Sequence, residues 1–309
     1  MNRLVFMGTP LFAELILQAL LGHFDIAAVI TQPDRGAGRG RKIKASCTKT
    51  FAQEHGLPML QPERIGDSGV IELLRAFRPR LIVVAAYGQI LPPDVLSVPD
   101  CGAINVHASL LPRHRGAAPI PASILAGDQQ TGVTIMLMDE GLDTGPILSQ
   151  AAQQILDHDT TASLTLKLGR LGGRLLLDTL PRWLSGSLEA TAQDGRAATY
   201  ARPVHREDGR IDWTDSADKI DRLIRAYNPW PGAFTSWGGK ELKLIRAHPE
   251  RSEPQSQSVG TVVLRGSHPA IVTGDGLLVL EELQLAGKHR LGAVEFARGQ
   301  RAFVGATLL

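Results

Sequence analysis

Three residue types that together suit acyl transfer lie close in this sequence. Asn105 and His107 are two residues apart in a short apolar run, and Asp143 follows in a glycine-flanked loop. A β-strand, with its period of two, would place Asn105 and His107 on one face. An amide donates hydrogen bonds, an imidazole is a base near neutral pH, and a carboxylate orients other groups. The set therefore indicates acyl-transfer chemistry.

Each of these residues also has an ordinary interpretation when it is taken alone. A histidine near the end of a strand is most often a polar residue satisfied by its neighbours. The stretch Leu-Asp-Thr-Gly-Pro around Asp143 has the composition of a turn. The catalytic interpretation depends on the surrounding motifs.

Those motifs resemble the 10-formyltetrahydrofolate-dependent formyltransferases. The resemblance is carried by Asn105-x-His107, by the later Asp143, and by the four residues Ser109, Leu110, Leu111 and Pro112. Residues 6–10, 113–120, 132–136 and 228–233 make it closest to members that act on initiator methionyl-tRNA. It spans essentially the whole chain. The resemblance implies transfer of the formyl group from 10-formyltetrahydrofolate to the α-amine of that tRNA, without a metal.

Roles for individual residues follow from the resemblance. It implies that Asn105 and a protonated His107 stabilise an oxyanion, while Asp143 orients His107 and favours its charged form. Residues 109–112 correspond to a folate-binding loop. A second wall of the folate site is expected from Ala86, Tyr87, Gly88, Gln89 and Ile90.

A basic stretch indicates contact with RNA phosphates. Residues 35–49 contain six of the chain's 33 basic residues and no acid. The alternative is a solvated charged loop without a binding role. The resemblance implies that this loop enters the acceptor stem of tRNA. Its three glycines and its repelling charges predict that it is mobile without RNA. The expected tRNA contacts are Arg35, Arg39, Arg41, Lys42, Arg202 and Arg206.

Two positions depart from the family pattern. His114 stands where tryptophan is common, and Pro203 stands where lysine is common. The second departure removes one expected tRNA contact, whose charge Arg202 or His205 would replace.

The order of predicted elements indicates an α/β fold with two domains. Strands at residues 4–7, 26–30, 81–86 and 103–106 alternate with helices, which is typical of a doubly wound, Rossmann-like sheet. A long helix is predicted near residues 160–184, and short strands follow residue 233. We expect a catalytic domain over 1–186, a linker over 187–204, and a small barrel over 205–309, which the resemblance implies is OB-like and binds tRNA.

Composition and motif spacing exclude several classes of protein. The two cysteines, Cys47 and Cys101, exclude a disulfide scaffold and a zinc ribbon, and a reducing cytoplasm fits them. No apolar run is long enough to span a membrane. The glycines at 36, 38 and 40 have the wrong spacing for a dinucleotide site, so no nucleotide cofactor is expected. A monomer is expected.

Two rival functions remain open on the sequence. Formyltransferases for glycinamide ribonucleotide or sugar nucleotides, and folate hydrolase relatives, share the N-terminal domain; the basic stretch and the C-terminal barrel favour tRNA instead. An inactive RNA-binding protein that kept the fold is the alternative from another class.

Overall fold

The computed structural model describes residues 3–37, 42–252 and 256–309. The chain forms two compact units. The first contains residues 1–120, 129–155 and 163–202, and the second contains residues 121–128, 156–162 and 203–309. Two short segments, 121–128 and 156–162, thus belong with the C-terminal part, and residues 187–202 belong with the N-terminal part. The three continuous domains expected from the sequence stay a prediction.

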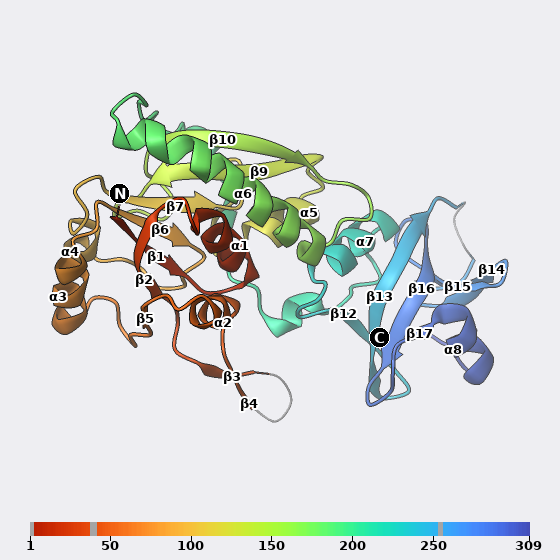
Figure 1. The fold of residues 1–309 in the computed structure, drawn as a ribbon. Helices are drawn as coiled ribbons and strands as arrows, with labels where there is room; N and C mark the ends of the chain where they lie inside the picture. Colours follow the sequence, from red (N-terminus) through yellow and green to blue (C-terminus); the bar gives the residue numbers. More distant parts are fainter. Residues whose placement is uncertain (1–2, 38–41, 253–255) are drawn as a thin grey trace. The chain divides into compact units, whose positions relative to one another are not determined.

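A seven-stranded sheet organises the first unit (Figure 1). Its strand order is β10-β9-β7-β6-β1-β2-β5. The strands from β7 to β5 are parallel, whereas β9 is antiparallel to β7 and β10 is antiparallel to β9. The doubly wound α/β expectation is confirmed, and the antiparallel edge is an addition that was not predicted. The bounds are β1 (Arg3–Gly8), β2 (Asp25–Ile30), β5 (Met59–Leu60), β6 (Leu81–Ala85), β7 (Ala103–His107), β9 (Gln130–Leu137) and β10 (Ile147–Gln154).

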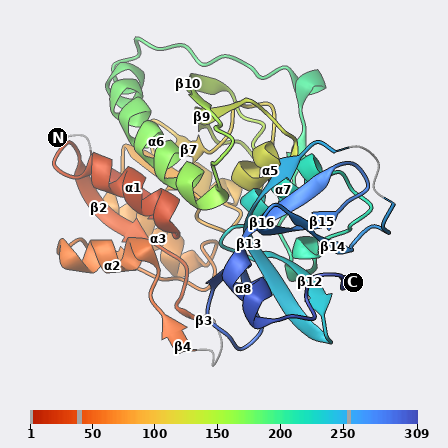
Figure 2. The ribbon, with the colours of Figure 1, turned by 90° about the vertical axis from the view of Figure 1, so that its right-hand side faces the viewer.

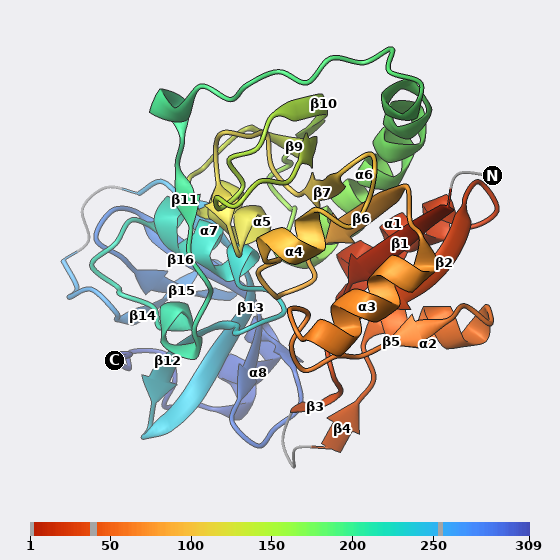
Figure 3. The same cartoon turned by 90° about the vertical axis from the view of Figure 1, so that its left-hand side faces the viewer.

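Helices cover both faces of this sheet (Figures 2 and 3). On one face lie α3 (Ser68–Phe77) and α4 (Pro93–Leu96), whose Leu74 and Val95 are fully buried in a core with Val5 and Ile82. On the other face lie α1 (Leu11–Leu20) and α6 (Thr161–Leu184). Burial on both faces explains why these strands are nearly continuous apolar runs.

Glycines let α6 approach α1 closely. A Cβ added at Gly173 would lie 2.6 Å from Cβ of Ala19, and one added at Gly169 would lie 2.6 Å from Cδ1 of Leu15. A glycine in a helix costs about 1 kcal/mol relative to alanine. Close packing against α1 offsets that cost here.

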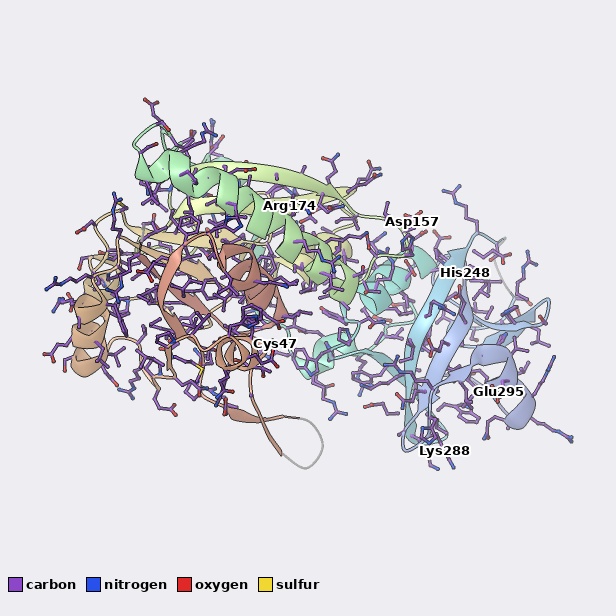
Figure 4. The ribbon with its side chains drawn as sticks, viewed as in Figure 1. Cys47, Asp157, Arg174, His248, Lys288 and Glu295 are labelled. Carbon is purple, nitrogen blue, oxygen red and sulfur yellow. The ribbon has the colours of Figure 1, made fainter. Side chains whose placement is uncertain are left out.

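The basic stretch is a hairpin followed by a helix, not the single loop expected. β3 (Arg35–Ala37) pairs antiparallel with β4 (Lys42–Lys44), and α2 (Cys47–Glu54) follows. Ser46 caps α2, because its Oγ accepts a hydrogen bond from the backbone N–H of Lys49 at 3.1 Å. Cys47 is exposed at the start of α2 (Figure 4), and both cysteines are free thiols.

The predicted linker contains structure of its own. β11 (Tyr200–Ala201) pairs in parallel with β8 (Arg115–Gly116), and a 3₁₀ turn occupies Gly195–Ala197. Two residues of pairing cannot be detected from composition, since no hydrophobic period marks them.

The second unit is a barrel-like antiparallel sheet domain. Its strand order is β12-β13-β16-β15-β14, with β17 paired to β16. Ile220 and Ile224 of α7 and Phe296 of α8 are buried in its core. The elements are α7 (Ala217–Ala226), β12 (Ala233–Trp237), β13 (Lys240–Glu250), β14 (Val262–Arg265), β15 (His268–Val272), β16 (Leu277–Leu285), β17 (Leu291–Gly292) and α8 (Ala293–Gly299), with a 3₁₀ turn at Arg206–Gly209. Helix α5 (Pro119–Leu125) begins in the first unit and continues into the second.

Candidate active site

Asn105 and His107 meet Asp143 at the end of β7. Asn105 Nδ2 donates to Asp143 Oδ1 at 3.1 Å, and His107 Nδ1 lies 3.6 Å from Asp143 Oδ2. The strand period of two places both side chains on one face, so that a single carboxylate reaches them. The three residues singled out in the sequence are brought together in the first unit.

Asp143 is held in an uncommon backbone conformation. Its φ is +53°, a region that aspartate visits more readily than most residues. Its Oδ2 accepts a hydrogen bond from the backbone N–H of Gly116 at 2.7 Å. The carboxylate therefore joins the loop after β9 to strand β8.

His107 is buried, with 5% of its surface exposed. Its Nε2 lies 2.9 Å from the carbonyl oxygen of His114. A carbonyl only accepts, so Nε2 carries a hydrogen and donates it. His114, the departure from the family pattern, contributes through its backbone.

Burial lowers the pKa of His107, while the Asp143 carboxylate raises it by a smaller amount. A neutral imidazole with its hydrogen on Nε2 has a lone pair on Nδ1, and that lone pair faces Asp143. The charged imidazole expected from the sequence stays a prediction. In this arrangement Nδ1 of His107 can accept one proton, and the Asp143 carboxylate beside it would stabilise the resulting imidazolium.

The loop at residues 109–112 is fixed by hydrogen bonds to β9 and β10. Thr134 Oγ1 donates to the Ser109 carbonyl at 2.7 Å and accepts from the Leu111 N–H at 3.0 Å. Gln150 Nε2 donates to the Leu111 carbonyl at 2.8 Å. Ser109 Oγ donates to the Arg113 carbonyl at 2.6 Å. Ser109 and Leu111 are buried, whereas Leu110 and Pro112 are partly exposed, so only the second pair offers side chains to a ligand.

Residues 86–90 likewise include both buried and exposed residues. Tyr87 is buried, which raises the pKa of its hydroxyl to about 12. Gln89 Oε1 accepts from the Ile65 N–H at 2.8 Å. Ala86, Gly88 and Ile90 are exposed, and Ile90 reaches 89%. A ligand can contact these three residues and the partly exposed Gln89, whereas Tyr87 is buried.

The predicted tRNA contacts are only partly described. Arg35 is exposed, and Lys42 lies in β4. Arg39 and Arg41 fall outside the described residues. Lys49 belongs to α2, where its Nζ lies 2.5 Å from Asp34 and 2.8 Å from Gln61 Oε1. Its charge is therefore neutralised locally.

In the second unit several cations already have acidic partners. Arg206 is exposed and pairs with Glu241 at 2.7 Å, and Arg225 pairs with Asp221 at the same distance. Arg222 packs against Gly127, and its Nε is buried. Arg202 is exposed at the end of the first unit.

Sequence reasoning missed several residues around Asp143. Gln193 donates from Nε2 to the carbonyls of Asp143, at 2.9 Å, and Gly145, at 2.7 Å. Its Oε1 accepts two hydrogen bonds from Arg115. Thr134 and Gln150 were missed as well. A single glutamine in a stretch of small polar residues carries no signal that marks a site.

Among the described residues there is no cluster of His, Cys, Asp or Glu that could hold a metal. Within the same residues, no helix combines the length and apolar character that a membrane span requires.

Comparison with known proteins identifies the family. The profile of the family described as formyl transferase matches residues 1–180, and that of the formyl transferase C-terminal domain matches residues 203–301. A methionyl-tRNA formyltransferase of Magnetococcus marinus is 47% identical over 96% of this chain and 95% of its own. One from Roseiflexus castenholzii is 44% identical over 99% and 98%.

This chain belongs to the methionyl-tRNA formyltransferase family. Among solved structures, an N-formyltransferase from Helicobacter canadensis in complex with folinic acid and dTDP-3-aminofucose covers 91% of this chain and 98% of its own. Its TM-score is 0.65 at 20% identity, which shows a shared fold. Membership in the methionyl-tRNA formyltransferase family rests on the close relatives, which this chain matches over nearly its whole length.

Proposed function

We propose that this protein transfers a formyl group from 10-formyltetrahydrofolate to the α-amine of methionyl initiator tRNA, for translation initiation. The observation that carries the proposal is the joint contact of Asn105 and His107 with Asp143, in a chain 43–47% identical to curated family members over nearly full length. We further propose that the enzyme is cytoplasmic and acts as a monomer.

The geometry supports a metal-free addition and elimination. The amine nitrogen bonds to the formyl carbon, whose oxygen takes negative charge. One N–H of Asn105 binds Asp143, and the other has no partner among the described residues, so it is available to that oxygen. Nδ1 of His107 accepts the proton that the amine loses. The bond from N10 to the formyl carbon then breaks as the oxyanion collapses to a carbonyl. N10 takes the proton back from His107 Nδ1, and tetrahydrofolate leaves.

Exposed residues beside these groups suit the folate. Ala86, Gly88 and Ile90 are exposed after β6, and Leu110 and Pro112 are partly exposed after β7. The parallel strands β6 and β7 are neighbours, so their carboxyl ends open at the same sheet edge, where α/β folds bind ligands. For the tRNA we propose Arg35, Arg39, Arg41 and Lys42 near the stem end, with Arg202 and Arg206 on the phosphate backbone.

One assay separates this function from its rivals. Purified protein is given 10-formyltetrahydrofolate with charged initiator tRNA, charged elongator tRNA, or free methionine. Formylation of the initiator species far above the other two is expected. Equal formylation of free methionine would assign the enzyme to small amines, and tRNA binding without any transfer would leave a binding protein.

A further inference from the structure

Gln193 uses its whole amide to connect the loop of Asp143 to β8. Both N–H groups donate to that loop, at Asp143 and Gly145, while the amide oxygen accepts from Nε and Nη2 of Arg115 at 3.1 and 2.7 Å. Hydrogen bonds from a charged guanidinium are stronger than neutral ones. Both N–H groups and the oxygen of the Gln193 amide are therefore engaged in hydrogen bonds.

Arg115 is an unusual partner for such a bridge. Only 5% of it is exposed, yet no carboxylate pairs with it among the described residues. The next residue, Gly116, donates its N–H to the Asp143 carboxylate. β8 therefore holds Asp143 twice, directly through Gly116 and indirectly through Arg115 and Gln193.

Other residues near Gln193 in the segment 187–202 make similar hydrogen bonds to residues around the candidate active site. Thr191 exchanges two backbone hydrogen bonds with Ile147, at 2.7 and 2.8 Å. Thr199 Oγ1 accepts from the N–H of His114, whose carbonyl receives the hydrogen of His107 Nε2. Tyr200 and Ala201 then pair with β8. Residues 187–202, here named the strap, thus reach the partners of both Asp143 and His107.

We infer that the strap is part of the catalytic apparatus and that Gln193 is a positioning residue, which keeps Asp143 against His107. Asp143 has a positive φ, and such a conformation persists only where its surroundings determine it from several sides. A shift of about 1 Å in an aligned group costs up to a hundredfold in rate. This inference rests on the proposed formyl transfer.

A double-mutant cycle on single-turnover formylation tests it. Gln193→Met keeps the volume of the side chain and removes its four hydrogen bonds. We expect a loss of roughly tenfold or more in rate at saturating substrates, with Michaelis constants within about threefold of the parent. In an Asp143→Ala background, where no carboxylate is left to position, the same substitution should cost less than about twofold. Equal fold-losses in both backgrounds would overturn the positioning role.

Amide hydrogen exchange gives a readout that needs no reaction. Peptides covering residues 139–147 should exchange faster in Gln193→Met, while peptides from β6 stay unchanged. Gln18→Met, at an exposed position on α1, is the matched control and should alter neither exchange nor rate. Unchanged exchange at 139–147 would refute the inference, whereas a parent protein without formylation would refute only the proposed function.

Discussion

Asp143 is the residue on which the others converge, since its two oxygens reach Asn105, His107 and the Gly116 N–H. Asp143→Ala and His107→Ala should each lower turnover by on the order of a hundredfold, the scale of acid–base assistance. Single-turnover formylation measures this. Asp157→Ala, at an exposed position (Figure 4), is the control. A loss of only a few fold in either site variant would remove that residue from the chemistry.

The buried imidazole predicts a pH dependence. Burial lowers the pKa of His107, so its neutral form persists below the usual value of 6.5. As a base it must be unprotonated, so the acidic limb of the rate profile should lie below pH 6.5. Asp143 raises the pKa of His107; removing this charge in Asp143→Asn should move the limb to still lower pH. A limb above pH 6.5, or one that Asp143→Asn moves upward, contradicts neutral His107 as the base.

Asn105 is predicted to act on charge that develops during the reaction. Asn105→Ala should therefore lower the turnover number far more than it raises the Michaelis constant for the folate. Steady-state kinetics with varied folate separate the two effects. A change confined to the Michaelis constant would make Asn105 a ground-state binding residue.

At the scale of elements, a glycine-to-alanine substitution should have opposite effects on stability at two positions, one in α6 where it packs closely against α1 and one in α8. Gly173→Ala should destabilise the protein by about 1–3 kcal/mol, because its Cβ would meet that of Ala19 at 2.6 Å. Gly299→Ala, in α8 with open space around it, should be neutral or stabilising by up to about 1 kcal/mol. Denaturant unfolding of both variants checks this, and equal midpoints would contradict the tight packing of α6.

The sequence predicted those elements whose burial creates a pattern. The apolar run of β6 and the Asn-x-His motif of β7 were sufficient to predict the central strands and part of the site. The two antiparallel strands were not predicted. β9 is largely apolar and buried but was not recognised as a strand, whereas β10, Ile-Leu-Ser-Gln-Ala-Ala-Gln-Gln, is half polar and has a single buried residue. The hairpin β3–β4 and the strap were missed because short backbone pairings leave no hydrophobic period.

At the scale of the whole molecule, the exposed cations of the second unit should act through salt-sensitive phosphate contacts. Arg206→Gln with Arg210→Gln should weaken tRNA binding and flatten its salt dependence by roughly one unit of log–log slope per lost contact. Folate affinity should stay unchanged. Arg222 is unsuitable for this test, because it packs against Gly127. Arg174→Gln on α6 is the control, and binding measured at several salt concentrations decides; an unchanged slope would exclude this surface.

The place of the strap in the chain bears on when, during synthesis, the contacts of Asp143 and His114 can be completed. The N-terminal family match ends at residue 180, and a gene cut there encodes every side chain of the Asn105, His107 and Asp143 set. Such a fragment lacks Gln193, Thr199 and β11, so the loops that carry Asp143 and His114 lose the hydrogen bonds that these residues supply. On the ribosome, the same state exists until residue 201 has emerged. We therefore expect no full formylating activity before the segment that joins the two family domains has been synthesised.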